Sequence, residues 1–295
     1  MKQLLILSGK GGTGKTTVAA AFIRLAAAKA YGDCDVDAPN LHLVTAQSTE
    51  LERTDYFGMP KARIDHEICT GCGLCRENCR FDAILQRDGF DTDRFACEGC
   101  GVCEVICPVH AIRMEPAIAG ELNLYRNPET VFSTAILKTG SGTSGKLVTE
   151  VKKQLLKNMY PDTELIVIDG SPGIGCPVIA SLSGVDMVLI VAEPSVSGIK
   201  DMKRIIETAR IFRTRIGVCI NKHDTNPVKS EAIEEYCAGE GIPFAGRIPF
   251  DRAAVEAINR QMTIADVDCP SGTAVRKVFS QTMKILTSEK EGANL

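Results

Sequence analysis

The chain has 295 residues, of which 44% are hydrophobic and 24% charged, and its net charge at pH 7 is −3. This composition is typical of a globular protein, and the length allows one large domain with a small one, or two domains of moderate size. The slightly acidic balance argues against nucleic acid as an obligatory partner. No apolar run approaches the ~18 residues that a membrane-spanning helix needs, and no cleavable signal precedes the first predicted strand. We therefore expect a cytoplasmic protein without stable membrane insertion.

A glycine-rich loop separates a predicted strand, residues 4–7, from an alanine-rich predicted helix, residues 18–29. Its pattern matches a P-loop, in which backbone N–H groups and a helix N-terminus bind phosphates. Lys15 is expected to reach the β- and γ-phosphates, and the Thr16 hydroxyl to hold Mg²⁺. A strand–helix turn without ligand is the alternative, which the flanking strand and helix disfavour. The predicted nucleotide-binding residues of the loop are Gly9, Lys10, Gly11, Gly12, Thr13, Gly14, Lys15, Thr16 and Thr17.

Lys10 is a second lysine inside this loop. With it, residues 9–17 resemble the deviant Walker A motif of the MinD/ParA/NifH class of P-loop ATPases. The resemblance implies that ATP is the ligand and that a nucleotide-dependent homodimer forms, in which Lys10 reaches a phosphate of the nucleotide held by the partner subunit. A lysine that is merely solvated in the loop is the alternative.

Two aspartates, Asp33 and Asp35, follow a very short predicted strand at residues 30–32. Closely spaced carboxylates near a P-loop can hold Mg²⁺ or orient an attacking water. The segment resembles switch I of the same class, which implies that Asp35 lies beside the hydrolytic water and that Asp33 supports it. A polar turn capped by its own aspartates is the alternative.

Eight of the thirteen cysteines lie in two blocks, which would be unusual in a reducing compartment unless they hold metal. The spacing is that of bacterial ferredoxins, in which the fourth cysteine of each block ligates the other cluster. The sequence therefore predicts two [4Fe–4S] clusters with crossed ligand sets. The first set is Cys69, Cys72, Cys75 and Cys107, and the second is Cys97, Cys100, Cys103 and Cys79.

Residues 61–116 thus resemble a two-cluster ferredoxin module inserted between residues 1–60 and 117–295 of an ATPase domain. Arg80 stands where such a module usually has a proline, and its charge can shift a cluster potential. Structural zinc is the alternative, but zinc usually takes two well-separated Cys-x2-Cys pairs, which does not explain four cysteines in each block. Eight free thiols are a second alternative.

The chain then returns to the main domain through a predicted hairpin, residues 117–137, a Gly/Ser loop, residues 140–145, and a helix, residues 146–159. The loop can be a mobile switch or a simple linker, and the sequence leaves both open.

An apolar strand ends at Asp169, the Walker B arrangement, so this carboxylate is expected to bind Mg²⁺ together with Thr16 and Asp35. Residues 170–178 resemble switch II, where Cys176 occupies the position of a cluster ligand of nitrogenase iron proteins. Because the motif of the other ligand has no counterpart here, we expect instead a thiol that lines the cleft.

The base of the nucleotide is expected to lie near Asn221, Pro249 and Phe250 by resemblance to the class. Residues 221–224 also match the Asn-Lys-x-Asp motif that reads guanine in GTPases, so GTP stays an alternative to ATP. The last predicted helix, residues 273–287, has an apolar face with few basic residues beside it. We expect it to pack on the domain and not to bind a membrane.

Strands alternate with helices outside the cysteine blocks, which predicts an α/β fold with a doubly wound, mostly parallel sheet and a small inserted α+β module. Over nearly its full length the chain resembles MinD-superfamily P-loop ATPases with an inserted ferredoxin domain. The resemblance implies a dimeric, ATP-hydrolysing iron–sulfur protein, interpreted as a nucleotide-gated electron carrier or redox switch that acts on a redox or cluster-accepting protein.

Three other functions compete with this interpretation. An iron–sulfur cluster assembly carrier usually has a Cys-Pro-x-Cys bridging motif, which is absent here. An ATP-dependent ligase of the cobyrinic acid a,c-diamide synthase type normally needs a glutaminase domain, for which no room remains. A spatial organiser like MinD would need the membrane helix and would leave the eight block cysteines without use.

Overall fold

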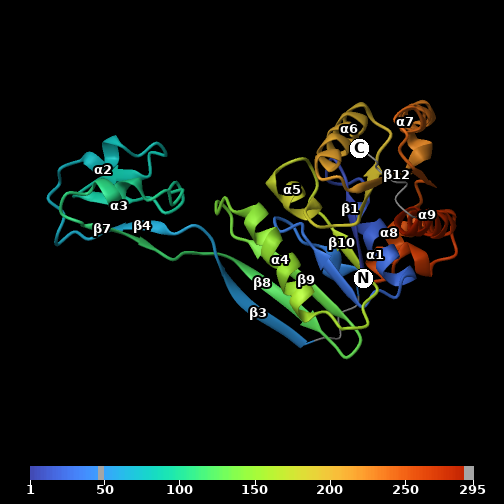
Figure 1. The fold of residues 1–295 in the computed structure, drawn as a ribbon, viewed down its shortest axis with the longest axis horizontal. Helices are drawn as coiled ribbons and strands as arrows, with labels where there is room; N and C mark the ends of the chain where they lie inside the picture. The colour runs from blue at the N-terminus through green and yellow to red at the C-terminus, as the bar shows by residue number, and fades with distance from the viewer. Residues whose placement is uncertain (46–49, 289–295) are drawn as a thin grey trace.

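The computed structural model describes residues 1–45 and 50–288. Its main part is a nine-stranded sheet (Figure 1). In spatial order the strands are β13 (Phe244–Ile248), β12 (Arg215–Asn221), β11 (Met187–Ala192), β1 (Lys2–Leu7), β10 (Leu165–Asp169), β2 (Ala30–Asp33), β9 (Val131–Leu137), β8 (Ile118–Arg126) and β3 (Glu50–Phe57). Neighbours from β13 to β9 run parallel, whereas β8 is antiparallel to β9 and β3 is antiparallel to β8.

Helices cover both faces of the parallel strands. The helices are α1 (Lys15–Leu25), α4 (Ser144–Asn158), α5 (Cys176–Leu182), α6 (Val196–Ile211), α7 (Pro227–Gly239), α8 (Arg252–Asn259) and α9 (Pro270–Thr287). One core joins α4, α5, α6 and α7 to the sheet, and the other joins α1 and α9 to the opposite face. Strands buried on both faces carry continuous apolar runs, as in the fully buried β11. The predicted doubly wound, mostly parallel sheet is therefore confirmed.

The ends of all three predicted helices differ from the structure, and α4 begins two residues earlier and ends one residue earlier than predicted. Helix α1 begins at Lys15, directly after the P-loop glycine, and ends before Ala27, whose positive φ of 44° is incompatible with helix continuation. Helix α9 begins at Pro270 because Cys269 caps it by accepting the N–H of Gly272. Its apolar face packs on the domain as predicted.

Strand β3 was not predicted. All but one of its side chains are exposed, so it lacks the apolar alternation that marks a strand, and only its ladder with β8 reveals it. The predicted hairpin of residues 117–137 is β8 with β9. None of the helices in the described residues is both long and apolar enough to cross a bilayer.

The cysteine-rich segment, residues 61–116, forms two small sheets of its own (Figure 1). It contains β4 (Lys61–Ile64), α2 (Leu74–Glu77), β5 (Ile84–Gln86), β6 (Phe90–Thr92), α3 (Val102–Ile106) and β7 (Ile112–Glu115). Strand β4 pairs with β7, and β5 with β6. The repeat is visible in the backbone, since Gly73 before α2 and Gly101 before α3 have φ values of 81° and 75°.

Candidate functional site

A cleft lies over the P-loop, where β1 ends and α1 begins. Every predicted nucleotide-binding residue except Gly9 lines it, including Asn221, Pro249 and Phe250 from the ends of β12 and β13. Asp35 reaches the same cleft from the loop after β2. The carboxyl ends of parallel strands meet at one edge of the sheet, which explains why residues far apart in sequence converge here.

The predicted magnesium ligands Thr16 and Asp169 lie together. The Thr16 hydroxyl donates to Oδ2 of Asp169 at 2.6 Å, and Nζ of Lys15 lies 2.5 Å from Oδ1. The pair is buried, with 6% of the Lys15 side chain exposed and none of the Asp169 side chain. A hydroxyl and a carboxylate are ligands that Mg²⁺ prefers, so these residues fit the ion and can hold it beside the phosphates.

The loop itself fits an anion. The Thr13 hydroxyl is buried and has no hydrogen-bond partner within the described residues, so it is available to a phosphate oxygen. Gly14 has φ of 88°, and a β-carbon there would lie 2.2 Å from Nδ2 of Asn221. Only glycine at this position leaves room for the Asn221 side chain to lie so close to the loop. From there Asn221 donates to the Thr13 carbonyl at 2.6 Å. Asn221 thus fixes the P-loop from the base side of the cleft.

Asp33 organises the segment that presents Asp35. Its buried carboxylate accepts the backbone N–H groups of Asp35, Asn40 and Leu41, each at 3.0 Å. Burial and the charge of Asp169, its register partner across β10 and β2, raise the pKa of Asp33 to about 7. Burial also raises the pKa of Asp35. The arrangement suits a supporting role for Asp33, with the Asp35 carboxylate facing the cleft.

Asp224 does not behave as a guanine-reading aspartate in this conformation. Its Oδ1 accepts the backbone N–H of Phe250 at 2.7 Å, and within the described part of the chain it is not among the residues that line the cleft. With Oδ1 held by the loop after β13 and the residue outside the cleft wall, Asp224 is not placed to contact a base in this conformation.

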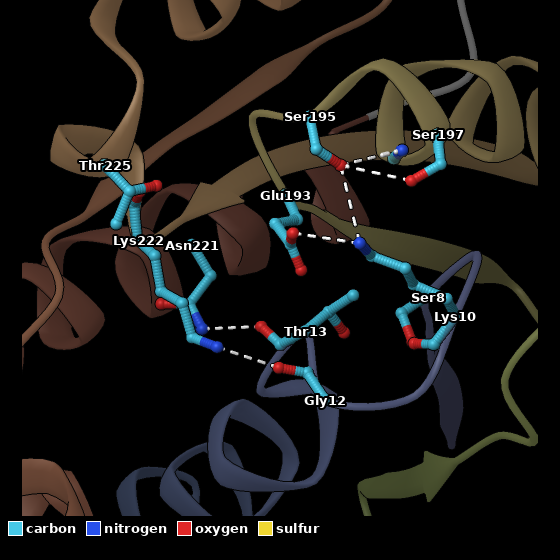
Figure 2. A network of polar contacts seen from close by, with 11 residues as sticks. Ser8, Lys10, Gly12, Thr13, Glu193, Ser195, Ser197, Asn221, Lys222 and Thr225 are labelled. Atoms are coloured by element: carbon cyan, nitrogen blue, oxygen red, sulfur yellow. Dashed lines mark hydrogen bonds and ion pairs between the residues drawn. The ribbon is translucent and has the colours of Figure 1, made fainter.

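Lys10 is turned toward its own subunit (Figure 2). Its Nζ lies 2.9 Å from Oε1 of Glu193 and 3.5 Å from the Ser195 hydroxyl, both just after β11. The predicted contact with the nucleotide of a partner subunit would need this side chain to leave Glu193.

The eight block cysteines line two small cavities of about 10 and about 20 Å³. Equivalent backbone N–H groups point at equivalent sulfurs, since Ala111 donates to Sγ of Cys107 at 3.3 Å and Ala83 donates to Sγ of Cys79 at 3.4 Å. The first cavity has Cys69, Cys72, Cys75 and Cys107 in its wall, and the second has Cys79, Cys97, Cys100 and Cys103. Each block thus sends its fourth cysteine to the other cavity.

Across residues 1–45 and 50–288, no three His, Cys, Asp or Glu side chains converge on a point that would hold a single metal ion. Cys176 is exposed at the start of α5 and belongs to neither the nucleotide cleft nor the two cysteine cavities. The prediction that it lines the cleft is therefore wrong for this conformation.

One residue of the cleft wall and two residues outside it escaped prediction. Lys222 donates from Nζ to the Gly12 carbonyl at 2.8 Å, which its place in the Asn-Lys-x-Asp motif could have suggested. For Glu193, the only feature of the sequence that could have pointed to the site is its position after a buried strand. Buried Lys152 of α4 donates to the Ser181 carbonyl of α5 at 2.8 Å and also to the Ser183 carbonyl, and nothing in the sequence marks it.

Comparisons with known proteins identify a family and several relatives of this chain. The family described as "CobQ/CobB/MinD/ParA nucleotide binding domain" matches residues 4–264. The uncharacterized protein MJ0578 of Methanocaldococcus jannaschii is 30% identical, covering 96% of this chain and 97% of its own length. The iron–sulfur cluster carrier protein of the same organism is 23% identical, over 98% of this chain and 86% of its own.

Solved structures agree on the fold. MinD of Pyrococcus horikoshii OT3, complexed with Mg-ADP, superimposes with a TM-score of 0.57 at 16% identity, covering 99% of each chain. The family match spans most of the chain and includes the P-loop, Asp35, Asp169 and Asn221. The chain therefore belongs to the CobQ/CobB/MinD/ParA family of P-loop ATPases.

Proposed function

We propose that this ATPase is a two-cluster iron–sulfur protein that acts as a nucleotide-dependent homodimer, in which ATP binding and hydrolysis gate electron transfer to a redox partner. The observation that carries the proposal is the crossed arrangement of the eight block cysteines, four around each cavity, in one chain with the nucleotide cleft. When bound, each [4Fe–4S] cluster supplies one-electron chemistry, and the chain supplies its ligands and surroundings.

The cavities suit clusters better than zinc. Four thiolates at about 2.3 Å from one zinc ion must converge to about 3.8 Å from one another. The described cysteines group as four around each cavity but do not converge in this way. The N–H groups of Ala83 and Ala111, aimed at Cys79 and Cys107, stabilise sulfur that carries negative charge.

A chain of contacts supports the gating. Helix α5 begins at Cys176 within the segment that resembles switch II, and Lys152 ties α5 to α4. At the start of α4, a β-carbon on Gly145 would lie 3.1 Å from Cβ of Cys176, so the two helices touch there without a side chain between them. A displacement of α5 would therefore move α4 and the loop before it.

That loop reaches the second cysteine cavity. A β-carbon on Gly142 would lie 3.5 Å from Oε2 of Glu98, which lines the cavity, and one on Gly140 would lie 3.6 Å from Cδ1 of Phe95. The loop that the sequence left open between switch and linker thus touches both α5 and the cysteine-rich segment. We assign it the switch role in this proposal.

On the nucleotide side, Lys15, Thr16 and Asp169 would bind Mg-ATP, and Asp35 would orient the attacking water. Gly173 of switch II donates its backbone N–H to the Ser8 carbonyl at 3.0 Å, beside the P-loop. Gly173 has φ of 97°, so the chain turns sharply there and continues into α5. A movement of the P-loop at the phosphates would therefore reach α5 through a few residues of switch II.

The test is anaerobic purification with iron and sulfide counts and EPR spectra, each with and without Mg-ATP. The proposal expects about eight irons per chain and spectra that change with nucleotide. Zinc or no metal on the eight cysteines would overturn it.

A cluster carrier is the second candidate, favoured by the exposure of Cys72 and Cys100 and by the relative named as a carrier. Exposed ligands allow an acceptor protein to approach a cluster. Transfer of iron and sulfide to an apo-ferredoxin, with spectra indifferent to Mg-ATP, would support the carrier over the gated electron carrier.

A further inference from the structure

We infer that Glu193 is a positioning residue for Lys10: it holds this lysine on its own subunit and releases it only to the phosphates of a nucleoside triphosphate bound by a second copy of the chain. This inference rests on the dimer of the proposed function. The ion pair between Nζ of Lys10 and Oε1 of Glu193, at 2.9 Å, is the observation behind it (Figure 2).

The backbone of Lys10 is held in place. A β-carbon on Gly9 would lie 2.2 Å from Cβ of Asp201, so the start of the P-loop rests directly on α6. On the other side, the Ser8 hydroxyl donates to the Lys10 carbonyl at 2.9 Å. Lys10 can therefore change from Glu193 to a phosphate only by moving its side chain. Its four-carbon stem can rotate while the phosphate-binding loop stays unchanged.

The pair is weak enough to exchange. Its side chains are 36% and 23% exposed, whereas the Lys15–Asp169 pair beneath the phosphates is buried. Ser195, which also contacts Nζ of Lys10, is the N-cap of α6, so the ammonium lies at the positive end of a helix. One carboxylate offsets this repulsion, and a triphosphate with several negative charges can compete for the lysine.

Two such pairs open when a symmetric dimer closes. Losing one exposed ion pair changes an equilibrium about 1.4- to 5-fold. Glu193→Gln removes the competing charge in both subunits and keeps the side-chain size. We expect it to lower the dimer dissociation constant about 2- to 30-fold, the square of the single-pair effect.

Sedimentation velocity of the full chain with Mg²⁺ and a non-hydrolysable ATP analogue measures this constant. The series is wild type, Glu193→Gln, Lys10→Ala and the double variant, with Glu240→Gln as the control because Glu240 makes an exposed ion pair with Arg210. The inference expects tighter dimers for Glu193→Gln, no change for the control, and a double variant as impaired as Lys10→Ala. The advantage of Glu193→Gln should shrink in 0.5 M salt, where exposed charges are screened.

The outcomes separate the two hypotheses. If wild type dimerises with the analogue and Lys10→Ala does not, but Glu193→Gln matches wild type or dimerises more weakly, Glu193 does not restrain Lys10 while the dimer of the proposed function stands. If the double variant dimerises better than Lys10→Ala, Glu193 acts through another group. If wild type stays monomeric, the dimer and the inference both fail.

Discussion

The nine-stranded sheet buries continuous apolar strands between two layers of helices, whereas the cysteine-rich segment buries only a few side chains around its two cavities. The sheet can be stable without a ligand because its core is large. The cysteine-rich segment is short enough that such a core needs covalent or metal support. The two regions thus differ in what stabilises them, and each variant below should damage one while sparing the other.

The largest effect is expected for Lys15→Ala. Removing the buried ammonium deletes a phosphate ligand and leaves the buried Asp169 carboxylate unpaired, so hydrolysis should fall by about 10²–10³-fold or more. Steady-state ATPase assays measure this, with the exposed Lys157→Ala as the control. Iron content should stay at the wild-type level, and a variant that loses iron as well would show that the regions are not independent.

The reverse variant is Cys75→Ser with Cys103→Ser, one change in each cavity. We expect loss of iron and protease cleavage within residues 61–116, because the small core there cannot compensate. ATP affinity, measured by titration calorimetry under anaerobic conditions, should change less than about twofold since these thiols lie outside the cleft. Cys176→Ser, outside both cavities, should retain its iron; equal iron loss in this control would contradict the assignment of ligands.

Lys152→Met tests the link between the regions. It keeps the length of the side chain but leaves the carbonyls of Ser181 and Ser183 without their donor, which should lower the free energy of unfolding by about 1–3 kcal/mol. The nucleotide-induced change in the EPR spectrum should also decrease. Urea denaturation and EPR are compared with those of Lys153→Met, whose exposed side chain should cost less than about 0.5 kcal/mol. If Mg-ATP changes the EPR spectrum of Lys152→Met as much as that of wild type, α4 does not transmit the movement of α5 to the cysteine-rich segment.

The smallest effect is expected for Gly145→Ala. The added methyl group would press on Cys176 at 3.1 Å and separate the start of α4 from α5, which offsets the ~1 kcal/mol that alanine gains over glycine in a helix. Hydrogen exchange of residues 138–146 should then respond less to Mg-ATP than in wild type. Gly239→Ala is the matched control, because a β-carbon there meets no atom within 4 Å. If hydrogen exchange in residues 138–146 responds equally to Mg-ATP in both variants, the contact between Gly145 and Cys176 does not couple α4 to α5.

Local patterns in the sequence predicted the main architecture. The apolar runs of β1 and β10 marked buried strands, and the P-loop spacing located the nucleotide cleft. The ferredoxin-type spacing of the cysteines predicted which four surround each cavity. Strand β3 was missed because its exposed side chains carry no periodic signal.

What the amino-acid sequence determined by itself is therefore the alternation of buried strands with helices, the phosphate-binding loop and the cysteine spacing, because each is written within a few neighbouring residues. Only the tertiary structure decided that Lys10 pairs with Glu193, 183 positions away, and that Asp224 holds the backbone of Phe250. Partners so distant in sequence are chosen by how the strand ends and helices pack. A side chain's local pattern carries no information about that choice.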